Sequence, residues 1–320
     1  MTEPREPLVV QAEELDPACA AWLAERCRVE VCPVDDPRFG LLMKEAQGLV
    51  VRTYTRVDRA LLDRAPRLRV AGRAGVGLDN FDLHACRERG VVVVSTPDAN
   101  TRAVVELVTA FILDALRPRL FLDKPLDIKA WKSLRQELLA PRQLADLTLG
   151  ILGLGRVGGG VARVGAAFNM RVLYSDLRTI PEDARHGALP VELDALLDQS
   201  DILSVHVDDR PTNRALLNRK NLRLMKPSAL LINTSRGFVI DPPGLADWLR
   251  SDPAARAVLD VHDPEPFGPD YPLLGLPNAH LSPHIGAATR TAHRNMSWVV
   301  RDVWRVLSGE APEFPAAPSR

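Results

Sequence analysis

Three glycines in the middle of the chain have the spacing G-x-G-x-x-G: Gly153, Gly155 and Gly158. They follow a short apolar run and precede an amphipathic stretch, so the sequence predicts a strand, a tight turn and a helix. In such a turn the first glycine permits the bend, the second lets the backbone approach a pyrophosphate, and the third lets helix and strand pack closely. The positive end of the helix dipole favours the phosphate charge. The pattern predicts a dinucleotide-binding loop; a purely structural turn is the alternative.

A carboxylate, Asp176, ends the next expected strand, eighteen residues after Gly158. Placed there, it would accept hydrogen bonds from the ribose hydroxyls on the adenine side of a dinucleotide. It would also repel the 2′-phosphate of NADP, which favours NAD as the cofactor. Arg178 lies two residues further on and would instead attract that phosphate, so NADP stays the alternative.

Three further residues at strand ends could carry acid–base chemistry. Arg236 follows the expected strand 230–233, Glu265 follows the expected strand 257–261, and His284 stands between a proline and an isoleucine. Oxidation by a nicotinamide needs a base for the hydroxyl proton, an acid that tunes this base, and a cation for the developing oxyanion. Each residue alone is consistent with a structural role. Because the carboxyl ends of parallel strands form the ligand-binding edge of a sheet, the three together predict a dehydrogenase site.

The composition limits the class of protein that positions these residues. Of 320 residues 46% are apolar, and 41 basic residues balance 41 acidic ones. This balance excludes a disordered chain and gives no global attraction to nucleic acid or to a membrane surface. No apolar run approaches the ~18 residues that span a bilayer, and the first residues have no signal-peptide pattern. The four cysteines form no Cys-x-x-Cys pair, so we expect reduced thiols, no metal site and a cytoplasmic location.

Short apolar runs alternate with amphipathic stretches along the whole chain, which predicts an α/β protein with parallel strands. The expected strands cover residues 48–51, 68–71, 91–95, 147–152, 171–175, 202–207, 230–233 and 257–261, and the expected helices cover 83–89, 104–116, 156–168 and 287–307. Residues 117–132 are expected to cross the surface. The proline-containing tail after Gly309 is expected to fray.

From about residue 50 to residue 307 the ordered motifs resemble the D-isomer-specific 2-hydroxyacid dehydrogenase family, most closely its phosphoglycerate dehydrogenase branch. The segments that carry the resemblance are residues 50–53, 72–80, 96–101, Glu106, 153–158, 233–237, 260–266 and 282–286. The resemblance implies that Arg236, Glu265 and His284 form the catalytic triad. His284 would exchange the proton, Glu265 would hold its other ring nitrogen, and Arg236 would grip the carboxylate and the carbonyl oxygen of the substrate.

The same resemblance implies NAD as the cofactor and assigns further binding residues. Cofactor-binding residues would be Gly153, Gly155, Arg156, Val157, Gly158, Asp176, His206, Thr234, Ser235, Asp260, His284 and Gly286. Substrate-binding residues would be Arg52, Thr53, Ala74, Gly75, Val76, Asn100 and Arg236. One departure lies beside the cofactor residues, where Asp208-Asp209-Arg210 replaces the usual Pro-Leu-Thr; we expect these carboxylates to face solvent, and weakened cofactor binding is the alternative.

The family fold implied by the resemblance consists of two doubly wound parallel-sheet domains with the active site in the cleft. Residues 1–98 and 287–320 would form a smaller, flavodoxin-like substrate domain, and residues 99–286 a Rossmann-like NAD-binding domain. A homodimer would form through an arm that contains residues 104–131. The expected activity is hydride transfer between nicotinamide and a D-2-hydroxyacid, with 3-phosphoglycerate as first candidate. A glyoxylate or hydroxypyruvate reductase and a non-catalytic, NAD-sensing corepressor-like scaffold are the alternatives.

Overall fold

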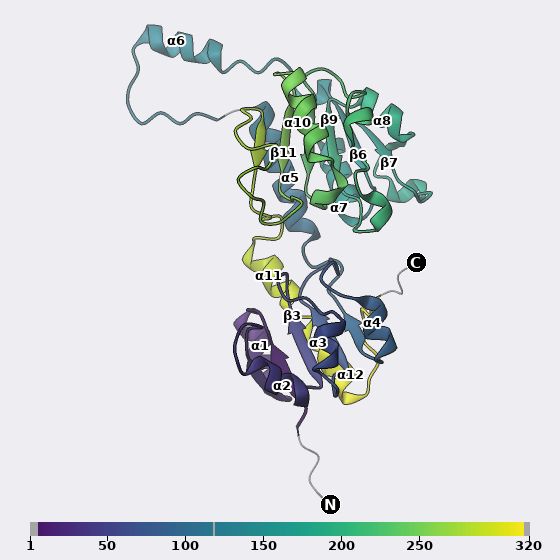
Figure 1. Cartoon of the computed structure of the whole chain (residues 1–320). Coiled ribbons are helices and arrows are strands. Elements are labelled where there is room, and N and C mark those ends of the chain that lie inside the picture. Colours follow the sequence, from purple (N-terminus) through teal and green to yellow (C-terminus); the bar gives the residue numbers. More distant parts are fainter. Residues whose placement is uncertain (1–5, 118, 317–320) are drawn as a thin grey trace, which may run out of the picture. The chain divides into compact units, whose positions relative to one another are not determined.

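The computed structural model describes residues 6–117 and 119–316, which fold as two compact α/β units (Figure 1). The smaller unit comprises Met1–Asn100 and Ala287–Arg320, and the larger unit comprises Thr101–Gly286. The boundary falls after Asn100, two residues beyond the one expected from the sequence. Part of the expected frayed tail, from residue 317 on, lies outside the described residues.

A five-stranded parallel sheet forms the centre of the smaller unit. Its order is β2-β1-β3-β4-β5, the arrangement of flavodoxin-like folds. The strands are β1 (Leu8–Gln11), β2 (Arg28–Val31), β3 (Gly48–Val51), β4 (Val70–Arg73) and β5 (Val92–Val94). Only the last three were predicted from the sequence, so the sheet is two strands wider than expected.

Helices cover both faces of this sheet, because successive strand residues point to opposite sides. Val9, Val50 and Val70 pack with α1 (Pro17–Ala24) and α12 (Val300–Ser308). Val10 and Val51 pack on the other face, where α2 (Phe39–Glu45), α3 (Arg59–Asp63) and α4 (Leu83–Glu88) lie. The smaller unit thus has two apolar layers around one sheet.

The C-terminal region departs from the expectation in two ways. The single expected helix 287–307 is two helices, α11 (Arg290–Ser297) and α12, because the chain tightens at Trp298 and Val299 into hydrogen bonds that span three residues. The tail is also not frayed up to residue 316. The buried Asp302 carboxylate accepts the N–H groups of residues 313 and 314, and Ala316 N donates to Val93 O, so the tail runs antiparallel to β5.

A seven-stranded parallel sheet forms the larger unit, with the order β12-β11-β10-β9-β6-β7-β8. The strands are β6 (Thr148–Leu152), β7 (Arg171–Ser175), β8 (Leu189–Pro190), β9 (Ile202–Val205), β10 (Leu230–Asn233), β11 (Arg256–Leu259) and β12 (Ala279–Leu281). Strand order reverses between β6 and β9, as in Rossmann folds. The predicted fold class, two doubly wound parallel-sheet domains, is therefore confirmed.

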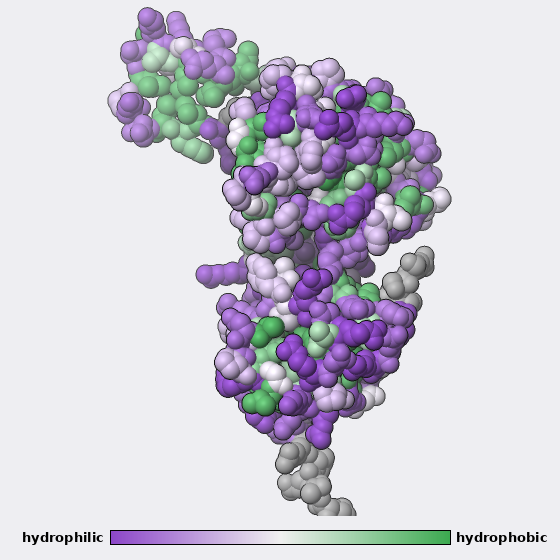
Figure 2. All heavy atoms as spheres, in the orientation of Figure 1, coloured by the Kyte–Doolittle hydropathy of each residue, from purple (hydrophilic) through white to green (hydrophobic). Residues whose placement is uncertain are grey.

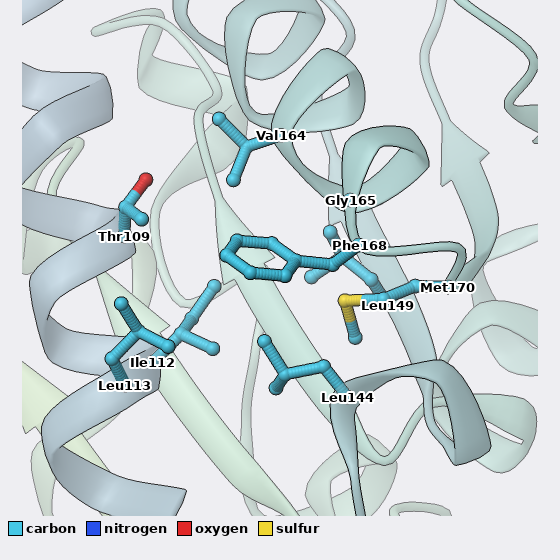
Figure 3. A pocket seen from close by; sticks show the side chains of 9 residues that line it. All are labelled: Thr109, Ile112, Leu113, Leu144, Leu149, Val164, Gly165, Phe168 and Met170. Carbon is cyan, nitrogen blue, oxygen red and sulfur yellow. The ribbon is translucent and has the colours of Figure 1, made fainter. Parts of the chain in front are cut away.

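The helices of the larger unit also lie on both faces of its sheet. One apolar layer contains α5 (Thr101–Leu116) and α7 (Arg156–Ala167), and the other contains α8 (Leu193–Gln199), α9 (Arg219–Leu222) and α10 (Pro242–Ser251). Between α5 and α7 lies an apolar void of about 10 Å³, bordered by Ile112, Leu149 and Phe168 (Figure 3). A void of this size is at the lower limit for one water molecule, so it is a packing gap and not a ligand site.

An arm, residues 119–139, joins α5 to the strand β6 region. It contains α6 (Ile128–Glu137), which was not predicted and buries none of its residues (Figure 1). Large hydrophobic side chains are exposed along it (Figure 2): Leu120, Phe121, Leu122, Ile128, Trp131, Leu138 and Leu139. In the described part of the chain no helix is both long and apolar enough to cross a membrane.

Candidate active site

The glycine loop joins β6 to α7, as the sequence predicts. Gly153 has a φ of +93°, and a Cβ there would lie 2.7 Å from the backbone oxygen of His206, so both conformation and space require glycine. A Cβ at Gly158 would lie 2.1 Å from Gly153 O, which explains the close approach of helix and strand. At Gly155, the N-cap of α7, the nearest atom to a Cβ would be Arg178 Nη2 at 3.9 Å. The backbone at Gly155 is therefore open to a ligand at the positive end of α7.

Asp176 follows β7 and faces this loop. Its Oδ2 accepts the N–H of Leu154 at 2.8 Å, and Arg178 donates to both carboxylate oxygens at 3.2 Å. Burial acts to raise the pKa of Asp176, but the Arg178 side chain and backbone N–H outweigh it and hold that pKa below its usual range. The carboxylate is therefore ionised beside the glycine loop, with an exposed guanidinium next to it.

A cavity of about 430 Å³ opens beside Asp176 and Arg178. Tyr174, Thr179 and Val191 also border it, so its lining contains both polar and apolar groups. These properties suit an adenine ring with a ribose whose hydroxyls reach a carboxylate.

His206 lies at the end of β9, the strand next to β6. Its N–H donates to Leu152 O at 2.7 Å, and its ring Nε2 is 2.8 Å from Ser204 Oγ. Burial lowers the pKa of His206 to about 3, so the ring is neutral near pH 7 and adds no charge beside the glycine loop. Just beyond it, Asp208 is half exposed and pairs with Arg210 at 2.7 Å. This arrangement agrees with the expectation that the unusual Asp208-Asp209-Arg210 segment faces solvent.

His284 and Glu265 form a hydrogen-bonded pair. His284 Nδ1 lies 2.7 Å from Glu265 Oε2, and the other carboxylate oxygen accepts the backbone N–H of His262 at 2.7 Å. Burial acts to raise the pKa of Glu265, but the His284 ring and the His262 N–H outweigh it and hold that pKa below its usual range. An ionised carboxylate fixes the proton of a neutral imidazole on Nδ1, which leaves Nε2 as the atom that exchanges a proton.

Asp260 holds the segment that carries His284. Its side chain is 1% exposed, and it accepts hydrogen bonds from Ser282 Oγ at 2.6 Å, Ile285 N at 2.8 Å and Gly286 N at 2.7 Å. The family resemblance implied that Asp260 binds the cofactor, but these hydrogen bonds were not predicted. No sequence signal marks them, because their partners lie 22 to 26 residues further along the chain.

Arg236 follows β10, which lies next to β11. Asn233 shapes the turn, since its side chain accepts the N–H and the hydroxyl of Ser235 and donates to Arg236 O. A Cβ at Gly237 would lie 1.9 Å from the carbonyl carbon of His262, so only glycine fits there. The turn that carries Arg236 thus packs directly on the segment between Asp260 and Glu265. The structure places all three predicted triad residues in loops at the carboxyl ends of β10, β11 and β12.

The residues at this edge fit a bound dinucleotide. Thr234 Oγ1 is buried and, within the described residues, has no hydrogen-bond partner, so it can bond a ligand amide. Arg156 and Val157 occupy the first turn of α7, and Gly286 is buried against Asp260. Bound NAD would supply the hydride chemistry. His284 would hold or deliver the proton at the substrate oxygen, and Arg236 would orient the substrate and stabilise its developing negative charge.

The remaining predicted substrate residues belong to the smaller unit and lie at the carboxyl ends of its strands. Arg52 and Thr53 follow β3, and Ala74, Gly75 and Val76 follow β4. Ala74 is buried and Gly75 has a φ of +151°, a backbone conformation that glycine adopts without strain. Asn100 is the last residue of this unit before α5. Among described residues, no group of three or more His, Cys, Asp or Glu side chains could hold a metal ion.

The fold and this site define a nicotinamide-dependent dehydrogenase of the α/β class. Comparison with protein families gives the particular group: residues 109–286 match the NAD-binding domain of the D-isomer-specific 2-hydroxyacid dehydrogenases. The chain belongs to this family and is an NAD-dependent enzyme that acts on the CH–OH group of a 2-hydroxyacid.

Curated relatives and solved structures agree with this assignment. The chain is 35% identical over 307 residues to a glyoxylate reductase of Aeropyrum pernix, covering 93% of this chain and 92% of that enzyme. It is 37% identical over 311 residues to a D-3-phosphoglycerate dehydrogenase of Mycobacterium leprae, covering 95% of this chain but only 57% of that longer enzyme. A solved structure from Thermus thermophilus matches with a TM-score of 0.83 and 34% identity, covering 97% of this chain and 100% of that one.

Proposed function

We propose that the chain interconverts 3-phosphoglycerate and 3-phosphohydroxypyruvate with NAD, the reaction that commits 3-phosphoglycerate to serine biosynthesis. In this proposal the larger unit contributes Arg236, Glu265 and His284 to the hydride-transfer step, and the smaller unit contributes the loop at residues 74–76 for the substrate carboxylate. The N–H groups of Ala74 and Gly75 donate to Val51 O and Arg73 O at 2.8 Å in this structure, so they would have to exchange these partners for the carboxylate. Asn100 and Thr53 would complete the substrate contacts. The likeness to phosphoglycerate dehydrogenases supports the substrate, although the chain spans about half the length of those relatives.

Arg52 is the observation that carries the choice of a phosphorylated substrate. It is half-buried at the end of β3, and within the described residues its guanidinium donates a single long hydrogen bond, of 3.4 Å, to Glu14 O. The other N–H groups of the guanidinium are therefore available to an anion. A dianionic phosphate would gain charge-assisted hydrogen bonds from them that an unphosphorylated substrate cannot form.

Steady-state kinetics with a panel of 2-oxoacids tests this proposal. In the wild type, kcat/KM with NADH should be highest for 3-phosphohydroxypyruvate, compared with hydroxypyruvate and glyoxylate. Arg52→Ala should lower the value for the phosphorylated substrate roughly 10–100-fold, the equivalent of ~1.5–3 kcal/mol, and leave glyoxylate nearly unchanged. Arg56→Ala is the matched control, because Arg56 is an exposed arginine in the same loop. Equal losses for the three substrates would show that Arg52 does not bind the phosphate.

Glyoxylate reduction is the second candidate function. It is favoured by the glyoxylate reductase of Aeropyrum pernix, a relative that matches this chain over 92% of its own length. A wild-type enzyme that prefers glyoxylate to 3-phosphohydroxypyruvate would establish it in place of the first.

A homodimer formed through the arm is part of the same proposal. Seven exposed hydrophobic side chains lie along residues 119–139, among them Phe121 and Leu139 at 85% and 74% exposure. Exposed apolar surface of this extent on one segment is typical of an interface. Light scattering after gel filtration should give a dimer for the wild type and a monomer for a Phe121→Asp/Leu139→Asp variant. A variant that is dimeric like the wild type would contradict a dimer interface on this arm.

A further inference from the structure

The loop that carries Arg52 is anchored through all four of its backbone N–H groups. Glu13, at the end of β1, accepts these hydrogen bonds with its carboxylate: from Arg52 at 3.0 Å, Thr53 at 2.9 Å, Tyr54 at 3.2 Å and Thr55 at 2.9 Å. Burial acts to raise the pKa of Glu13, but these donors outweigh it and hold that pKa below its usual range. The side chain is therefore an anion enclosed by successive N–H groups, as in anion-binding nests.

Asn80 holds the same loop through its carbonyl groups. Its Nδ2 donates to Thr55 O at 2.6 Å and to Arg52 O at 3.2 Å. Asn80 is itself fixed, because its backbone oxygen accepts the N–H of Val57 at 2.8 Å. Glu13 thus accepts hydrogen bonds from the N–H groups of the loop, and Asn80 donates hydrogen bonds to its carbonyl groups. Both side chains bond the backbone of Arg52.

The position of Arg52 depends on these two side chains more than on its own contacts. Among described residues its guanidinium donates only the long bond to Glu14 O, so hydrogen bonds of the side chain itself hold it weakly. What remains to fix it is the direction of its Cα–Cβ bond, which the loop backbone sets. Among the other side chains of the loop, Tyr54 is 88% exposed and only Thr55 is buried, so the loop packs against the unit at one residue.

We propose that Glu13 and Asn80 are positioning residues that preorganise Arg52 for the distal anion of the substrate. This inference rests on the proposed function, since it requires that Arg52 bind that anion. A binding residue holds its ligand less tightly when the side chains that orient it are removed, even though those side chains do not touch the ligand. If Glu13 and Asn80 only stabilised the fold, replacing them would lower kcat/KM equally for all substrates.

A double-mutant cycle tests the proposal on the full-length enzyme. Glu13→Gln keeps one acceptor oxygen and turns an NH2 group toward N–H donors, so the loop loses part of its anchor. We expect kcat/KM for 3-phosphohydroxypyruvate to fall about 10-fold and kcat/KM for glyoxylate to change less than about 2-fold. In the Glu13→Gln/Arg52→Ala variant the loss should equal that of Arg52→Ala alone, because Glu13 acts through Arg52. Glu14→Gln, the exposed neighbour, is the matched control and should leave both values unchanged.

The outcomes separate this inference from the proposed function. If Arg52→Ala distinguishes the two substrates but Glu13→Gln does not, or if the two losses add, the positioning role is wrong and the proposed substrate stands. If Arg52→Ala does not distinguish them, the proposed substrate is wrong and the positioning role falls with it. Hydrogen exchange of the amides of residues 52–55 should rise in Glu13→Gln and stay at the wild-type level in Glu14→Gln. Asn80→Ala supplies a second variant with the same expected substrate selectivity should Glu13→Gln fold poorly.

Discussion

Replacing Asp260 by asparagine should lower kcat by displacing His284, although Asp260 does not contact the His284 side chain. The Asp260 carboxylate accepts three hydrogen bonds of 2.6–2.8 Å from the segment 282–286, two of them from the backbone N–H groups of Ile285 and Gly286. An asparagine has one acceptor oxygen, so whichever way the amide turns, one backbone N–H meets an NH2 group and loses its partner. Gly286 and Asp260 are both buried, so water cannot replace the lost bond at low cost.

The expected magnitude follows from these bonds. An orphaned buried N–H costs about 1–3 kcal/mol, and the bonds that remain weaken because their acceptor is no longer charged, which gives about 2–4 kcal/mol in all. If the segment relaxes to relieve this cost, His284 shifts relative to Glu265. A displacement of about 1 Å at a catalytic group lowers turnover roughly 100-fold, so we expect kcat to fall about 10–100-fold.

The assay is NADH consumption with saturating 2-oxoacid, together with a thermal unfolding curve. Asp263→Asn is the matched control, because Asp263 lies in the same loop but is partly exposed and pairs with Arg214 at the surface. Surface pairs contribute about 0–1 kcal/mol, so this variant should stay within about 2-fold of wild-type kcat. An Asp260→Asn enzyme with the turnover and melting temperature of Asp263→Asn would refute the reasoning.

Three further predictions concern the cofactor site, the pH dependence of stability and the substrate arginine of the larger unit. Asp176→Ala should narrow the preference for NADH over NADPH, as measured by the ratio of their kcat/KM values; a wild type that already prefers NADPH would make Arg178 the deciding residue. Asp201→Asn should lower the melting temperature more at pH 7 than at pH 3. Burial acts to raise the pKa of Asp201, but the Thr148 N–H and two basic side chains outweigh it, so the stability it contributes is present above about pH 4 and is lost as the pH falls further; an equal difference at both pH values would contradict this. Arg236→Lys should lower kcat/KM at least about 10-fold, because lysine lacks the planar two-point grip, and a near wild-type value would remove Arg236 from the site.

Much of the fold could be predicted because buried parallel strands are short apolar runs. β3, β6, β7 and β10 appear in the sequence within one or two residues of their actual bounds. β2 was missed because it is an edge strand whose four residues are all exposed or half-buried, so it has no apolar run. α6 was missed although Ile128, Trp131 and Leu134 recur at every third residue, because residues 117–132 were expected only to cross the surface.

In the candidate site, too, the residues that belong to local motifs were predictable, and those that act through distant contacts were not. The glycine loop, Asp176, Glu265 and His284 were predictable, because each lies within a few residues of a strand end in a contiguous motif. The side chains that support them were not. Glu13 bonds a loop 39–42 residues away, and no property of its own sequence neighbourhood distinguishes it from the exposed Glu14. Such partners become visible only when the sheet brings the strand ends together.

The central claim is that His284, held by Glu265, exchanges the proton in an NAD-dependent 2-hydroxyacid oxidation. The most direct measurement is kcat for His284→Gln with NADH and the best 2-oxoacid substrate, alongside NADH affinity from fluorescence titration. We predict a fall in kcat of roughly 10²–10⁴-fold, the usual range for loss of a general acid–base group, with an NADH dissociation constant close to that of the wild type. A variant that keeps more than about a third of wild-type turnover would contradict the account.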